Sequence, residues 1–148
     1  MKPLLVGEMN PYGADPHFAL YPAPEKSAGW RLCVKVMGLP RAEYLRRFDR
    51  ANLCTGKWSV VAARAEASRL AALDHVVYVL FGKKVCDAFR LDFSPFTVVA
   101  PPRQAKRAVI LPHPSGLCRA WNEAGAFERA RRVLREAGVL LPEDGCAS

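Results

Sequence analysis

Short apolar runs alternate with amphipathic segments along this chain. Residues 4–6 form a first apolar run that predicts a buried strand. Residues 75–81 are apolar at nearly every position and are followed by Gly82. Such a run is typical of a central strand in a parallel sheet, because helices cover both sides of it. Further strands are predicted at 48–54 and 108–111, and an edge strand or a loop at 96–100.

The segments between these runs have the spacing of helices. Ser27 stands where an N-cap belongs and Gly38 supplies a stop, which predicts a helix over 28–37. Further helices are predicted at 41–47, 60–73, 83–89 and 123–137. Because each parallel connection needs a helix to cover the sheet, the order predicts a three-layer α/β/α sandwich with a short, mostly parallel central sheet. The 148 residues are expected to form a single domain, 1–148.

Residues 7–24 lack a clear period and are rich in proline and glycine, which predicts a long loop after the first strand. Loops of this length in a compact domain more often bind or catalyse than merely connect. The loop is therefore the first candidate for a functional segment.

The charge points to an anionic partner. The 22 Lys and Arg residues against 14 Asp and Glu leave a formal net charge of +8. A basic surface favours nucleic acid or acidic lipid, but charge by itself gives affinity without selectivity.

The cysteines predict neither a metal site nor a disulfide scaffold. The 5 cysteines are scattered and form no Cys-x-x-Cys pair, as expected for reduced thiols in an intracellular protein. The apolar run near the N-terminus is too short for a signal peptide, and no later run approaches membrane-spanning length. We expect a cytoplasmic protein without a metal or an organic cofactor.

Chemistry-bearing residues gather where the predicted strands end. Residues 7–13 follow the first strand, 52–54 close the second and 111–117 follow the last. Ligands of open parallel sheets bind outside the carboxyl ends of the strands, so these three segments are expected to converge on one crevice. Their amides, imidazole, hydroxyl, carboxylate and aromatic ring suit the recognition of a flat polar heterocycle.

Two motifs carry a resemblance to a known family. The Asn10-Pro11-Tyr12 motif after the first strand and the His113-Pro114-Ser115 motif after the last resemble those of the uracil-DNA glycosylase superfamily. The resemblance extends from Val6 to the last helix. It implies the fold of that superfamily and a monomeric enzyme that flips a base out of DNA and hydrolyses its N-glycosidic bond. The product is an abasic site, and uracil or a related pyrimidine is the leading substrate.

The resemblance also implies roles for individual residues. Asn10 matches the residue that orients the attacking water, and Tyr12 matches one that fills the space beside carbon 5 of the base. Asn52 matches the amide that reads the edge of the base, and Phe18 is the stacking candidate in the same loop. His113 matches the donor to O2 of the departing base, where a fixed donor stabilises the developing anion.

Four more residues are expected to contact DNA. Ser115 matches a phosphate contact, and Leu117 matches the wedge that fills the vacated stack. Arg119 and Lys57 are candidates for flanking phosphates.

The chain departs from the family pattern at one point. Two residues, Glu8 and Met9, separate Gly7 from Asn10 where the common pattern has one. Either the loop bulges to restore the position of Asn10, or Glu8 is the general base and Asn10 a secondary contact.

Simpler interpretations remain open for these residues. Both motifs are also favourable turn sequences, and an Asn such as Asn52 after a strand often only satisfies loop backbone. Phe18 can belong to the core, with Tyr21 as a rival for its role. Trp30, Trp58 and Trp121 are interpreted as packing residues. Two other functions are also open: excision of a modified cytosine from phage DNA as an antiviral defence, and a non-catalytic DNA-binding module.

Overall fold

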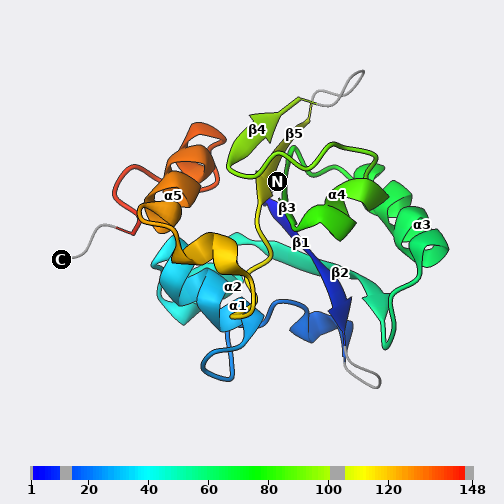
Figure 1. Cartoon of the computed structure of the whole chain (residues 1–148), viewed down its shortest axis with the longest axis horizontal. Helices are drawn as coiled ribbons and strands as arrows, with labels where there is room; N and C mark the ends of the chain where they lie inside the picture. The colour runs from blue at the N-terminus through cyan, green and yellow to red at the C-terminus, as the bar shows by residue number, and fades with distance from the viewer. Residues whose placement is uncertain (1, 11–14, 101–105, 146–148) are drawn as a thin grey trace.

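A mostly parallel five-stranded sheet forms the centre of the protein, which we describe from a computed structural model over residues 2–10, 15–100 and 106–145. The strands are β1 (Leu4–Asn10), β2 (Asp49–Thr55), β3 (Val77–Phe81), β4 (Thr97–Val99) and β5 (Arg107–Leu111). Their order is β2-β1-β3-β5-β4, and only the pairing of β4 with β5 is antiparallel within the described residues (Figure 1). The predicted mixed α/β class with a mostly parallel sheet is confirmed.

Helices lie on both sides of this sheet. They are α1 (Ala28–Trp30), continued by the π-helical η2 (Arg31–Met37), then α2 (Arg41–Arg47), α3 (Val60–Ala71), α4 (Lys83–Ala88) and α5 (Ala126–Glu136). Two short 3-10 turns are η1 (Pro16–Phe18) and η3 (Arg119–Asn122). Figure 1 shows α3 and α4 on one side of the sheet and α1, α2 and α5 on the other. The arrangement is compatible with three layers.

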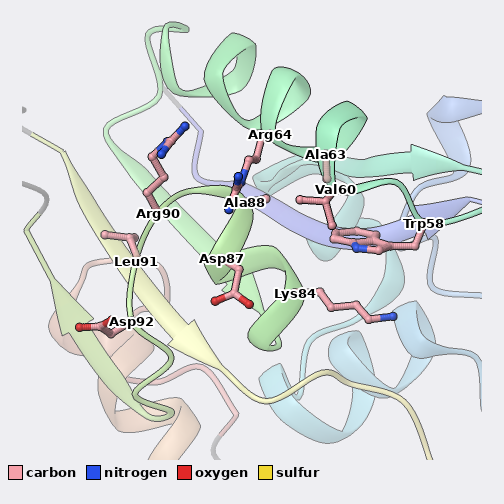
Figure 2. Close-up of a pocket in the computed structure, with 10 residues that line it drawn as sticks. All are labelled: Trp58, Val60, Ala63, Arg64, Lys84, Asp87, Ala88, Arg90, Leu91 and Asp92. Atoms are coloured by element: carbon pink, nitrogen blue, oxygen red, sulfur yellow. The ribbon is translucent and has the colours of Figure 1, made fainter.

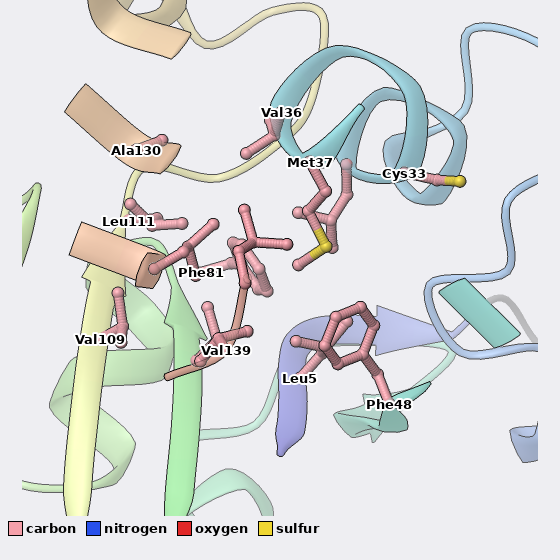
Figure 3. Close-up of a cluster of buried hydrophobic side chains, with 14 of the residues drawn as sticks. Leu5, Cys33, Val36, Met37, Phe48, Phe81, Val109, Leu111, Ala130 and Val139 are labelled. Atoms are coloured by element: carbon pink, nitrogen blue, oxygen red, sulfur yellow. The ribbon is translucent and has the colours of Figure 1, made fainter. Parts of the chain in front are cut away.

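Two buried clusters explain why both faces are covered. Leu5 and Val79 pack on one face with residues of η2, α2 and α5 (Figure 3). Their strand neighbours Leu4, Val6 and Leu80 pack on the other face with residues of α3 and α4. Successive side chains of a strand point to opposite faces, so an apolar run without alternation supplies both clusters at once.

The first strand is longer than its apolar run predicts. Residues 7–10 belong to β1, where Met9 pairs with Cys54 and Asn10 pairs with Thr55. The expectation of a loop from Gly7 onward is therefore wrong for these residues. Backbone pairing with β2 continues past the point where the side chains become polar, because ladder hydrogen bonds do not require apolar side chains.

The loop after β1 returns to the sheet and packs on it. The side chain of Leu20 lies over Gly7, and its backbone adopts a left-handed conformation with φ of 49°. The Tyr44 hydroxyl donates to the Leu20 carbonyl at 2.8 Å, and Arg50 Nη1 donates to the Ala19 carbonyl at 2.8 Å. These two bonds tie the loop to α2 and β2.

No helix in the described part of the chain is long and apolar enough to cross a lipid bilayer.

We expect Tyr44→Phe to lower the free energy of unfolding by about 1–3 kcal/mol, because the buried Leu20 carbonyl loses its donor. Urea denaturation measures the change. As a control, Val61→Ala at an 81% exposed position should stay within about 0.5 kcal/mol of the wild type. Equal midpoints for Tyr44→Phe and the wild type would contradict the assigned role of this bond.

Candidate functional site

The carboxyl ends of β1, β3 and β5 bring three residues together. Val6 of β1 pairs with Leu80 of β3, and Phe81 of β3 pairs with Leu111 of β5. Gly82 directly follows Phe81. Glu8 lies two residues after Val6, and His113 lies two residues after Leu111. The strand register therefore places a carboxylate, a bare backbone and an imidazole side by side.

Gly82 forms the backbone between the other two side chains. A Cβ at Gly82 would lie 3.5 Å from Glu8 Oε1 and 3.8 Å from His113 Cδ2. Its φ of 91° is also one that residues with a side chain rarely adopt. The carboxylate and one edge of the imidazole thus both border the backbone of Gly82.

Two hydrogen bonds fix the position of His113. The Ser115 backbone N–H donates to His113 Nδ1 at 3.1 Å, so the neutral ring carries its proton on Nε2. The indole Nε1 of Trp121 donates to the His113 carbonyl at 2.8 Å. Trp121 itself stacks on Phe127 with ring centroids 5.4 Å apart. The ring and the backbone of His113 are both held by neighbours.

Electrostatics keep the imidazole neutral. Burial lowers the pKa of His113 below its ordinary value; the carboxylate of Glu8 opposes this shift, and the ammonium of Lys84 adds to it. At neutral pH the site therefore presents a neutral N–H donor beside a carboxylate.

A pair of amides joins the end of β1 to the middle of β2. Asn52 Nδ2 donates to Asn10 Oδ1 at 2.7 Å, and Asn10 is only 5% exposed. The Gly56 backbone N–H donates to the Asn10 carbonyl at 2.7 Å. A Cβ on Gly7 would collide with Asn52 Oδ1, so this glycine makes room for the amide. The two asparagines that were expected to handle water and base form one hydrogen-bonded unit.

The loop after His113 presents the expected DNA contacts to solvent. Ser115 Oγ accepts a hydrogen bond from the Leu117 backbone N–H at 3.1 Å, which folds this turn. The side chain of Leu117 is 92% exposed. Arg119 in η3 and Lys57 after Gly56 are also exposed. Leu117, Arg119 and Lys57 are thus exposed, whereas Ser115 is half-buried, and the roles of all four stay predictions.

The two aromatic candidates differ in what is known of their positions. Tyr12 lies outside the described residues. Phe18 is 53% exposed in η1, which packs against β2, and its ring meets Tyr21 edge-on at 5.0 Å. Within the described residues no ring contact or hydrogen bond joins Phe18 to Glu8 or His113.

Three residues of the site escaped the sequence analysis. Gly82 and Lys84 follow the strand over 75–81. The three segments expected to form the crevice did not include the carboxyl end of this strand. Applying the same rule to that strand would have found them. Trp121 packs as expected, but its indole also anchors the His113 carbonyl, which no sequence pattern signals.

No three His, Cys, Asp or Glu side chains in residues 2–10, 15–100 and 106–145 lie close enough to share a metal ion. Cys33, Cys54, Cys86 and Cys118 are free thiols. Burial raises the pKa of Cys33 to about 11 and that of Cys86 to about 12, so both are protonated and unreactive at neutral pH.

We expect Glu8→Gln to lower the pKa of His113, because the opposing carboxylate is lost, and Lys84→Gln to raise it, because a neighbouring cation is lost. An NMR titration of the imidazole signals measures both shifts, with His17 and His75 as internal references. Shifts in the same direction for the two variants would contradict the described geometry.

Comparison of the chain with known proteins gives no family. No protein-family model matches it, and a search of curated proteins gives no match. The site is thus defined by its own geometry: a carboxylate and a neutral imidazole border one glycine, and a hydrogen-bonded amide pair joins the neighbouring strands.

Proposed function

We propose that the protein is a DNA glycosylase with the uracil-DNA glycosylase fold, which flips a nucleotide out of DNA and hydrolyses its N-glycosidic bond. The observation that carries this proposal is that the Glu8 carboxylate and the His113 imidazole both border Gly82, with the charge of the carboxylate acting on the imidazole. Cleavage of that bond leaves negative charge on the base and positive character on the sugar. A neutral donor and a carboxylate are the two groups that stabilise these charges.

His113 serves the leaving base. Its Nδ1 accepts from Ser115, which leaves the Nε2–H to donate to the base oxygen as negative charge develops. The lowered pKa keeps the ring neutral, so it acts as a fixed hydrogen-bond donor and does not have to lose a proton first. Removal of one such donor typically costs about 100- to 1000-fold in rate.

Glu8 serves the water and the sugar. Its carboxylate borders the same glycine as His113 and its charge acts on the imidazole, whereas the amide oxygen of Asn10 is already an acceptor for Asn52. A carboxylate can take a proton from the attacking water and can stabilise a cationic sugar, and an amide has no useful basicity. Of the two possibilities that the sequence leaves open, this geometry favours Glu8 as the general base.

Asn10 then acts through Asn52. By accepting from Nδ2, Asn10 fixes which end of the Asn52 amide is the donor and which is the acceptor. An amide held in one orientation distinguishes the edge of uracil from that of cytosine, since the two bases exchange donor and acceptor positions. We assign Asn10 as a positioning residue and Asn52 as the reader of a uracil-like pyrimidine.

We expect the wild type to release free base from DNA containing uracil, and Glu8→Gln and His113→Ala to lose about 100- to 1000-fold in single-turnover rate. Asn10→Ala should lose less rate but more of the preference for uracil over cytosine. Glu136→Gln, an exposed change on α5, is the matched charge control and should keep full activity.

Substrates with hypoxanthine and with modified cytosines complete this assay. Strand breaks under alkali only in DNA with modified cytosine would show that the substrate assignment is wrong. Binding without an abasic product in any of these substrates would leave a DNA-binding module instead of an enzyme.

The rate should fall as the pH drops below the ordinary histidine range, because protonation of Nδ1 breaks its bond from Ser115. Since burial lowers the pKa of His113, this loss should begin below the usual pKa of 6.5. Lys84→Gln raises the pKa of His113 and should move the acid limb to higher pH. A pH profile of kcat/KM measures it, and an acid limb unchanged in Lys84→Gln would contradict the assignment.

A further inference from the structure

A groove between α3 and α4 is not used by the proposed reaction. It encloses about 480 Å³ and is lined by polar and charged residues over an apolar floor. Trp58, just before α3, and Lys84 of α4 lie on one side of the view, Arg90 and Asp92 lie on the other, and Arg64 of α3 lies between them (Figure 2). We call this site the α3–α4 groove.

The α3–α4 groove begins at the catalytic end of the sheet. Lys84 follows β3 closely, and its charge acts on His113. The same ammonium lies 5.5 Å from the ring centroid of Trp58. Trp58 in turn follows Lys57 in the turn after β2, beside the backbone of Asn10. A bound polymer that extends from the catalytic end into the groove therefore meets Trp58 and Lys84 first.

The charges of the groove favour an anionic chain. Asp87 pairs with Lys83 at 2.8 Å, which neutralises one of the two acids in the lining. No ion pair within the described residues engages Arg64, Lys84 or Arg90. Three cations along one groove, with an aromatic ring at its mouth, match the alternating phosphates and bases of a nucleic-acid strand.

Arg90 has a backbone conformation that favours glycine. Its φ is 60°, in the left-handed region, and it follows the end of α4 with its N–H bonded to the Asp87 carbonyl at 3.0 Å. Glycine is the usual residue in such a helix-ending position. An arginine in this conformation lowers the stability of the fold relative to glycine. What arginine adds, and glycine would not, is an exposed guanidinium that lines the groove.

We infer that the α3–α4 groove binds the single DNA strand that continues from the flipped nucleotide, with a base on Trp58 and phosphates on Arg64, Lys84 and Arg90. The volume of about 480 Å³ lies in the range of sites that hold small organic ligands, which suits one or two nucleotides and not a duplex. This inference rests on the proposed function, since it takes the strand from the catalytic end.

Binding of a fluorescein-labelled oligothymidylate of about 12 nucleotides, followed by anisotropy at several salt concentrations, tests the groove without any base excision. Arg64→Gln and Arg90→Gln should each weaken binding several-fold and reduce the slope of log K against log salt by about 0.7. Arg132→Gln, an exposed change on α5 on the other side of the sheet, is the matched control and should leave the slope unchanged.

Two further variants separate binding from folding. Arg90→Gly should keep or raise the melting temperature, because glycine suits the left-handed backbone, and should weaken binding as Arg90→Gln does. Bound DNA should quench tryptophan fluorescence in the wild type and much less in Trp58→Phe.

The outcomes distinguish this inference from the proposed function. If the wild type does not bind the oligonucleotide, or if Arg64→Gln and Arg90→Gln bind it with the same slope as Arg132→Gln, the groove is not a strand site. If those variants still release base from uracil DNA at the wild-type rate, the strand site in the groove is wrong and the proposed glycosylase activity is retained. If binding depends on the groove but the protein releases no base, the strand site is retained and the proposed glycosylase activity is wrong.

Discussion

The arrangement at the carboxyl end of the sheet centres on the backbone of Gly82. Three parallel strands bring Glu8, Gly82 and His113 to the same edge, and a Cβ at the middle position would lie within 4 Å of both neighbours. The carboxylate and the imidazole therefore both border this one backbone position. The φ of 91° is the reason for glycine here, because residues with a side chain rarely adopt it.

A second glycine makes room for a neighbouring side chain one strand away. Gly7 of β1 pairs with Asn52 of β2, and its missing side chain leaves room for the Asn52 amide. That amide bonds to Asn10, while Leu20 closes over Gly7 from the returning loop. Polar groups thus lie within a sheet edge that is otherwise tightly packed, and the Asn10 side chain is held by a hydrogen bond. Preorganisation of this kind is what electrostatic catalysis requires.

His113 is held between opposing electrostatic effects. Burial and the charge of Lys84 favour the neutral ring, and the carboxylate of Glu8 favours the protonated one. The Ser115 N–H on Nδ1 selects the neutral tautomer with its proton on Nε2. Lys84 also faces the α3–α4 groove, so the same cation links the imidazole to the surface proposed to hold the strand.

The sequence by itself determined the order of strands and helices, because apolar periodicity and caps are local properties. The helix over 41–47 and the strand end at Phe81 are examples. It also placed His113 just after the last strand, since motifs and strand ends can be read along the chain. It missed the extension of β1 to Asn10, because pairing with β2 is not visible in the pattern of β1.

Only the tertiary structure decided which of these residues meet. The register of β1 against β3, and of β3 against β5, puts Glu8 and His113 next to Gly82. The pairing of β1 with β2 engages Asn10 with Asn52. Sequence spacing left Glu8 and Asn10 as alternative candidates for handling the attacking water. Which of the two lies next to His113 depends on strand pairing, which sequence spacing does not show. The roles of Lys84 and Trp121 likewise depend on contacts between segments far apart in the chain.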